Sequence, residues 1–254
     1  MQPELDIGPL ELQTFGICFA AAFLAAGVVV GRRLREQGHP IDWSYEMVFS
    51  GLIGGLVGAR LDFVLENYDE VKDDLLGNVF SGAGLVWYGG VIGGAVGVLL
   101  WARFRRYPLL QVADLYAPAG ALGYAIGRIG CQLSGDGDYG VKSDLPWAMS
   151  YPDGTVPTTD EVHPTPLYEL LAMTAAAYVL WRLRDRFRPG GLFALYLVLA
   201  GAERFLVEII RRNDSVVAGL TLPQLVSLAM IGAGGVWLAR LRTSPARPPA
   251  QEPA

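Results

Sequence analysis

The sequence predicts an all-α membrane protein with seven transmembrane helices, its amino terminus outside and its carboxyl terminus in the cytoplasm. Of the 254 residues, 52% are hydrophobic and only 18% are charged, whereas an average soluble protein has about 25% charged residues. The mean hydropathy is +0.33. Seven apolar stretches of 17 to 23 residues follow one another, and a helix needs about 20 apolar residues to cross a bilayer.

These stretches define the predicted helices of a single transmembrane domain over residues 1–242. They run over residues 10–31, 46–66, 84–102, 109–131, 165–181, 190–210 and 219–239. Glu4 and Asp6 precede the first stretch, where a signal peptide carries basic residues, so we expect a permanent helix there. The Pro- and Ala-rich residues 243–254 are predicted to be a disordered tail.

The basic residues set the predicted orientation. If all seven stretches cross the membrane, thirteen of the 20 Lys and Arg residues fall on one side and four on the other. The positive-inside rule places the richer side in the cytoplasm. Residues 132–164, between two of the stretches, then form a long external loop that is rich in Gly and Pro. A loop of this length is typical of a functional segment.

Composition also excludes several classes of protein. The apolar content excludes a soluble enzyme and a disordered chain, and a net charge of -5 argues against a nucleic-acid partner. The two cysteines, Cys18 and Cys131, show neither a disulfide framework nor a metal-ligand spacing. We therefore expect no metal and no cofactor.

Glycines recur four residues apart in two of the stretches, a spacing that lets helix backbones approach closely in lipid. The pairs are Gly51 with Gly55, Gly54 with Gly58, Gly89 with Gly93, and Gly90 with Gly94. Gly89 and Gly90 follow Tyr88 at the predicted outer end of a helix, where a bare backbone can also admit a ligand.

Three arginines inside the apolar stretches carry the functional signal. Arg60, Arg128 and Arg204 each lie in the later third of an outward-running helix, at the expected level of the outer leaflet. Each charge costs about 2.5–3.5 kcal/mol at the bilayer centre on insertion scales, so we expect each arginine to have an ion-pair partner or a function. Arg128 has no carboxylate within seven residues, and we expect it to be the most available to an external anion.

Internal pairing is the alternative explanation for the other two arginines. Arg60 has Asp62 and Glu66 nearby, and Arg204 has Glu203 next to it and Glu208 one turn further along a helix.

An arginine pair at headgroup depth favours phosphate as the ligand, because a guanidinium binds phosphate with two hydrogen bonds and keeps its charge. Phospholipid headgroups are the phosphates found there. The same outer rim collects Tyr88, Asp136, Asp138 and His163. Glu169, one turn into the next helix, is expected to cap that helix or to orient a partner.

Four segments resemble the prolipoprotein diacylglyceryl transferase family, in matching order and spacing over about residues 10–240. Residues 127–136 look like its signature, which begins Gly-Arg-Ile-Gly. Residues 163–169 are similar to its His-Pro-Ser-Gln-Leu-Tyr-Glu element, and residues 204–211 to its Arg-Phe-x-x-Glu-Phe-x-Arg element. Residues 84–94 resemble its Gly-x-x-x-His-Gly-Gly-x-x-Gly segment.

The chain departs from the family pattern at several polar positions. Tyr88 stands where the family usually has His, Cys131 replaces Asn, and Asp136 replaces Glu. Two family tyrosines correspond to Phe15 and Ala200. Arg128 and Arg204 retain the arginines of the family pattern.

The resemblance implies a multi-pass enzyme of the bacterial inner membrane. Such an enzyme moves diacylglyceryl from phosphatidylglycerol to the lipobox cysteine thiol of preprolipoproteins at the outer leaflet and releases glycerol phosphate. Its expected partners are phosphatidylglycerol, preprolipoprotein signal peptides and membrane lipid.

The expected site residues combine this resemblance with the chemistry above. The catalytic candidates are Arg128, Arg204, His163, Tyr88 and Asp136. The substrate-binding candidates are Arg128, Arg204, Gly89, Gly90, Gly130, Cys131, Gly140 and Glu208. His163, Asp136 and Asp138 are alternatives for the base that deprotonates the acceptor thiol.

Two other functions remain open at this point. A related protein that binds or modifies phospholipid headgroups without lipoprotein transfer would keep the arginines but not the lost Tyr, His and Asn groups. A small-solute transporter would spread polar residues through both halves of the membrane, whereas here they cluster outward, with Asp114 as the exception.

Overall fold

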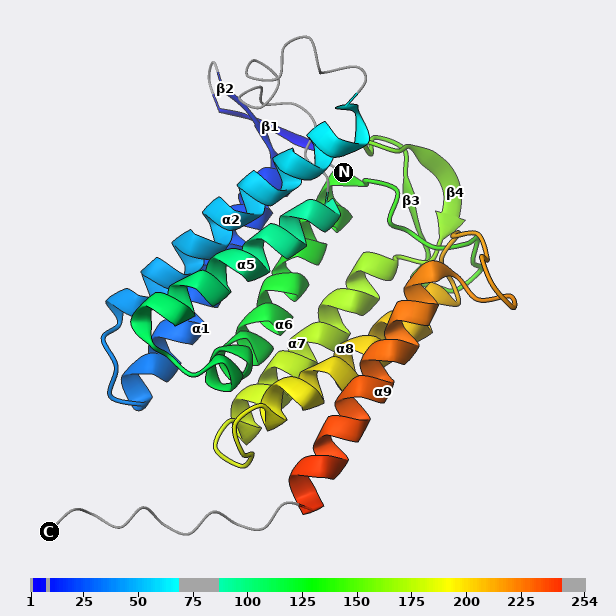
Figure 1. Ribbon diagram of the computed structural model, residues 1–254. Coiled ribbons are helices and arrows are strands. Elements are labelled where there is room, and N and C mark those ends of the chain that lie inside the picture. The colour runs from blue at the N-terminus through cyan, green and yellow to red at the C-terminus, as the bar shows by residue number, and fades with distance from the viewer. Residues whose placement is uncertain (1, 8–9, 69–86, 244–254) are drawn as a thin grey trace, which may run out of the picture. The chain divides into compact units, whose positions relative to one another are not determined.

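The computed structural model describes residues 2–7, 10–68 and 87–243. In this part of the chain, seven helices and two small antiparallel sheets form the regular structure (Figure 1). The helices are α1 (Thr14–Glu36), α2 (Asp42–Glu66), α5 (Trp87–Arg105), α6 (Leu109–Ser134), α7 (Thr165–Leu183), α8 (Gly191–Glu208) and α9 (Leu222–Thr243). The strands are β1 (Glu4–Ile7), β2 (Leu10–Gln13), β3 (Met149–Tyr151) and β4 (Thr158–Val162). The expected helical fold is confirmed for these residues.

Each predicted apolar stretch lies mainly on one of these helices, with its ends shifted by a few residues. The stretch at 10–31 was placed too early, because residues 10–13 pair as β2 with β1 and the helix begins at Thr14. Of the predicted tail 243–254, Thr243 is the last residue of α9, and residues 244–254 lie outside the described residues. Within the part of the chain that the structure describes, three helices are long and apolar enough to cross a membrane: α1, α2 and residues Leu222–Leu241 of α9.

The predicted external loop 132–164 is largely ordered by its own contacts. Helix α6 extends to Ser134, and β3 pairs with β4 in the register Met149 with Val162 and Tyr151 with Thr158. Tyr139 stacks on Tyr151 with ring centroids 4.8 Å apart, and both pack with Val162 in a small buried core. This segment is therefore a small folded cap, not an irregular connector.

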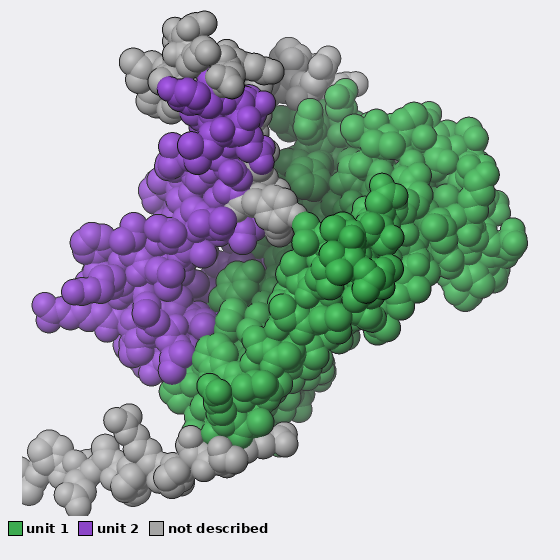
Figure 2. Space-filling view, turned by 45° about the vertical axis from the view of Figure 1, so that its right-hand side comes forward, with its two compact units in different colours: residues 1–22, 116–254 green, residues 23–115 purple. Residues whose placement is uncertain are grey.

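The chain divides into two compact units, which are coloured separately in Figure 2: residues 1–22 with 116–254, and residues 23–115. In the unit of residues 23–115, α2 and α5 pack side by side through glycines. A Cβ added to Gly58 would lie 2.7 Å from the Cα of Gly93. At the start of α5, the Gly89 N–H donates a 2.8 Å hydrogen bond to Asp62 Oδ2. The glycine spacing therefore serves close helix packing here.

In the other unit, small residues bring α6, α7 and α8 together. Ala117, Ala121 and Ala125 repeat along one face of α6 and are fully buried. They share a core with Met173 and Leu180 of α7. This shared core sets α6 against α7 and α8, and the polar residues Arg128 of α6 and Arg204 of α8 follow it by about one helical turn.

Substitution of a buried glycine tests this packing. In Gly93→Ala the new methyl group would meet the Gly58 backbone, and overpacking of this kind typically costs about 1–3 kcal/mol. We expect a lower melting temperature in detergent. The matched control is Gly235→Ala, because a Cβ at Gly235 meets nothing within 4 Å and alanine favours a helix by about 1 kcal/mol over glycine. Equal melting temperatures for the two variants would contradict the assigned packing.

Candidate functional site

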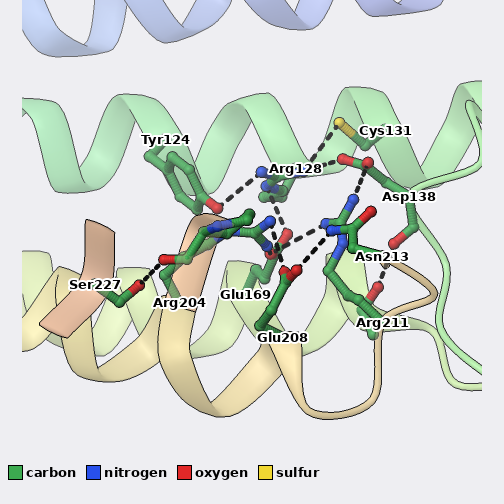
Figure 3. Close-up of polar contacts among 12 residues, drawn as sticks. Tyr124, Arg128, Cys131, Asp138, Glu169, Arg204, Glu208, Arg211, Asn213 and Ser227 are labelled. Carbon is green, nitrogen blue, oxygen red and sulfur yellow. Dashed lines mark hydrogen bonds and ion pairs between the residues drawn. The ribbon is translucent and has the colours of Figure 1, made fainter. Parts of the chain in front are cut away.

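The candidate site is a network of three guanidinium groups and three carboxylates within the unit that contains α6 to α9 (Figure 3). We call it the arginine cluster. Its members come from α6, from the folded cap, from α7, and from α8 and the turn after it: Arg128, Asp138, Glu169, Arg204, Glu208 and Arg211. Four helix or cap segments thus converge on one set of alternating charges.

Glu169 lies at the centre of the cluster, and its side chain is 0% exposed. Its Oε2 lies 2.6 Å from Nε of Arg128, and its Oε1 lies 3.2 Å from Nη1 of Arg204 and 3.5 Å from Nη1 of Arg211. Of the two expectations for Glu169, the structure supports the orientation of partners, because Glu169 contacts three arginines and forms no capping hydrogen bond at the start of α7.

Arg128 is more fully engaged than we expected. It pairs with Glu169 and Asp138, and its Nη2 donates a 2.8 Å hydrogen bond to the Tyr124 hydroxyl. Its Nη1 also lies 3.6 Å from Sγ of Cys131. The expectation that Arg128 is the arginine most available to an anion was wrong, because its carboxylate partners come from another helix and from the folded cap.

Arg204 is the more open of the two arginines. Its Nη1 contacts Glu169 and its Nη2 lies 2.8 Å from Oε2 of Glu208, one turn along α8. These contacts use two of the five N–H groups of the guanidinium, and its side chain is 25% exposed against 15% for Arg128. The predicted pairing with Glu208 is confirmed, yet it leaves hydrogen-bonding capacity for a ligand.

Arg211, one of the four basic residues that the orientation rule places outside, is also a member of the cluster. Its side chain is 11% exposed and forms ion pairs with Asp138 and Glu169. The signal that pointed to it was its place at the end of the segment that resembles the family's Arg-Phe-x-x-Glu-Phe-x-Arg element. Asp138 bridges Arg211 to Arg128 and so ties α6 to the turn after α8.

Glu208, a member of the cluster, and Asp136, which lies next to Asp138, differ in their surroundings. Glu208 is buried, and its Oε1 accepts hydrogen bonds of 2.8 Å from Thr221 and 2.7 Å from Asn213. Asp136 lies at the edge of the cap, where its Oδ1 accepts a 3.3 Å hydrogen bond from the Asp138 N–H.

The two aspartates of the cap have opposite pKa shifts. Burial opposes ionisation of Asp138, but Arg211 and Arg128 outweigh it and hold the pKa of Asp138 below its ordinary value. Burial, together with the negative charge of Asp138, raises the pKa of Asp136. Asp138 is therefore a fixed anion of the cluster, and Asp136 is the better proton acceptor of the pair.

His163 lies beside the cluster at the junction of the cap and α7. Its backbone oxygen accepts a 2.9 Å hydrogen bond from the Gly140 N–H. Its Nδ1 lies 3.3 Å from the hydroxyl of Tyr168, which accepts a 2.8 Å hydrogen bond from Trp147 Nε1. Tyr168 therefore connects the imidazole of His163 to Trp147 through one hydroxyl group.

The predicted glycine ligands have structural roles in the described residues. A Cβ on Gly140 would lie 2.5 Å from the Ile210 oxygen, so Gly140 lets the cap lie against the end of α8. A Cβ on Gly130 would lie 3.0 Å from Cβ of Cys18 on α1. Gly89 and Gly90 belong to the other unit, where Gly89 packs against Gly58. The side chain of Tyr88 lies outside the described residues.

Arg60 also lies in the other unit, on α2. Its side chain is largely buried, with the residue 6% exposed, and its guanidinium lies over the Phe63 ring at 4.9 Å.

One group of side chains has the spacing of a metal site. Ligand atoms of Cys131, Asp136 and Asp138 lie within 4.8 Å of one another. Two guanidinium groups are already paired with Asp138, and their positive charge disfavours a cation at the same place. The two guanidinium groups therefore make this arrangement a poor site for a metal ion.

The structure predicts that Glu169 is far more important for stability than a surface carboxylate. In Glu169→Gln three arginines lose their shared negative charge, and breaking a buried ion pair typically costs about 3–5 kcal/mol. Asp160→Asn is the matched control, since its 2.9 Å pair with Lys142 is exposed and exposed pairs contribute about 0–1 kcal/mol. Thermal unfolding in detergent measures both, and equal losses would show that Glu169 does not hold the cluster together.

The chain has relatives along nearly its whole length. It matches the family model described as prolipoprotein diacylglyceryl transferase over residues 4–240. A protein of Clostridium tetani named phosphatidylglycerol–prolipoprotein diacylglyceryl transferase is 31% identical over 240 residues, which cover 92% of this chain and 95% of the relative.

Relatives with the same name occur in distant bacteria. The Bordetella parapertussis protein is 34% identical over 270 residues, covering 98% of both chains. The Thermotoga petrophila protein is 32% identical over 249 residues, covering 94% of this chain and 84% of the relative. The chain therefore belongs to the prolipoprotein diacylglyceryl transferase family.

Proposed function

We propose that this protein transfers diacylglyceryl from phosphatidylglycerol to the lipobox cysteine thiol of preprolipoproteins, at the outer leaflet of the bacterial inner membrane. The single observation that carries this proposal is that Arg204 is held by two carboxylates and still remains partly exposed. Buried Glu169 and Glu208 hold one side of its guanidinium, while the side chain stays 25% exposed with N–H groups to spare. The relatives are named for the same transfer.

The topology belongs to the same proposal. We infer seven membrane spans, with the amino terminus and the folded cap outside and the carboxyl terminus in the cytoplasm. Support comes from the three helices with the length and apolarity of spans and from the bias of thirteen basic residues to four between the two sides. In this orientation the arginine cluster lies at the level of the outer headgroups.

The donor phosphate would bind at Arg204, with Arg128 behind it. Both guanidinium groups are already fixed in direction by carboxylates, so little reorganisation is needed when charge develops on the leaving group. Transfer breaks the bond between the glyceryl carbon and the phosphate oxygen, and the electron pair stays on the departing glycerol phosphate. The acceptor sulfur forms the new carbon–sulfur bond.

The acceptor thiol must lose its proton to attack, because the thiolate is the nucleophile and a free thiol has a pKa of about 8.5. Asp138 is committed to Arg128 and Arg211, which leaves Asp136 and His163 as the groups of the outer rim that can accept this proton. The raised pKa of Asp136 favours it as the base. Cys131 is buried and lies against Arg128, and no covalent intermediate on it is needed.

Removal of either arginine should abolish transfer without preventing membrane insertion. We expect Arg204→Ala to lower the transfer rate by about 10²–10³, the usual loss for one preorganised donor to a developing anion. Arg204→Lys should remain impaired, because an ammonium cannot contact Glu169, Glu208 and phosphate in the planar geometry of a guanidinium.

The assay follows the mass of a lipobox peptide incubated with purified protein and phosphatidylglycerol vesicles. Arg186→Ala, on the cytoplasmic side of the proposed topology, is the control that should retain the parent rate. A peptide mass that never increases with the parent protein would favour a headgroup-binding protein, and Arg204→Ala at the parent rate would refute the role of the cluster.

A further inference from the structure

Glu203 is a carboxyl group beside the arginine cluster that the proposed chemistry leaves unexplained. It directly precedes Arg204 on α8, and the sequence analysis offered it as an alternative partner of that arginine. The structure gives the ion pair to Glu208 instead. Glu203 Oε1 is buried, and none of the described residues donates a hydrogen bond to it. Ionisation is costly for a carboxyl group with a buried oxygen that has no donor, whereas the protonated group is neutral.

The charges of the cluster are balanced without Glu203. Three guanidinium groups, of Arg128, Arg204 and Arg211, meet three carboxylates, of Asp138, Glu169 and Glu208. An ionised Glu203 adds a fourth negative charge to this set. A phosphodiester that enters at Arg204 then meets a net negative site, and in a partly buried site such repulsion is poorly screened.

Glu203 lies within electrostatic reach of the groups that would hold the anion. Its carboxyl group interacts with Arg128 on α6, Glu169 on α7, Arg204 on α8 and Arg211 after α8. The phenols of Tyr124 on α6 and Tyr196 on α8 also interact with it. Helix α9 packs against α8 near this point through Ser227 and Met230 at Gly201, neither of which titrates. The charge state of Glu203 therefore acts on the arginines and on their ligand together.

We propose that binding of an anionic phospholipid headgroup at the arginine cluster is coupled to protonation of Glu203, an inference that rests on the proposed phospholipid donor. The neutral carboxyl group leaves the cluster able to accept one phosphodiester charge. The ionised group repels that charge. Headgroup affinity consequently falls as the pH rises through the titration of Glu203, by about tenfold per pH unit for one linked proton.

Calorimetric titration of the full-length protein with short-chain phosphatidylglycerol tests the coupling. Titrations in two buffers of different ionisation enthalpy count the protons taken up on binding. We expect the parent protein to take up a proton, and its affinity to fall with rising pH. Glu203→Gln keeps the size of the side chain but cannot titrate, so its uptake should vanish and its affinity should stay high at alkaline pH.

Two further variants separate this effect from a loss of folding. Glu203→Asp retains a titratable group and should retain proton uptake. Glu161→Gln removes an exposed carboxyl group of β4 and should behave as the parent does. Binding without proton uptake, or uptake that persists in Glu203→Gln, would overturn the role of Glu203 and leave the transferase proposal intact. A parent protein that transfers nothing and binds no phosphatidylglycerol would overturn both.

Discussion

The arrangement of the site depends on one buried carboxylate, that of Glu169, which meets three guanidinium groups from other parts of the chain. Charges in a poorly solvated site are tolerated only when they are paired. Each arginine is therefore held in place by the carboxylate, and the carboxylate is held in place by the arginines. The fold supplies this constraint through the alanine-lined contacts of α6, α7 and α8.

The folded cap also helps to hold the charged groups in place. It delivers Asp138 to Arg128 and Arg211, and Gly140 lets its backbone lie against the end of α8, where Val141 N–H donates to the Ile210 oxygen at 2.8 Å. Asp138 thus connects the cap to α6 and to the turn after α8 by charge, while Tyr139 and Tyr151 give the cap a core of its own. In the resulting arrangement Arg204 keeps a larger exposed fraction than Arg128, which suits the phospholipid binding that we propose.

Much of the site was predictable where the contact is local in sequence. The pair of Arg204 and Glu208 follows from their spacing of one helical turn, and it is present at 2.8 Å. The partners of Arg128 were not predictable in this way, because Glu169 lies on a different helix and Asp138 lies beyond a turn formed by Gly135 and Gly137, both with positive φ. The burial of Arg211 was not predictable for the same reason, since its partners Asp138 and Glu169 are distant from it in sequence.

The sequence by itself determined the helical class, the approximate position of each helix and the presence of residue types that suit phosphate binding, because hydrophobic length and charge are properties of the chain before it folds. Only the tertiary structure decided which arginine stays open. That choice depends on how the shared core sets α6, α7 and α8 against one another and on where the cap places Asp138. Coulomb energy depends on distances between atoms of different segments, and those distances exist only after the segments have packed.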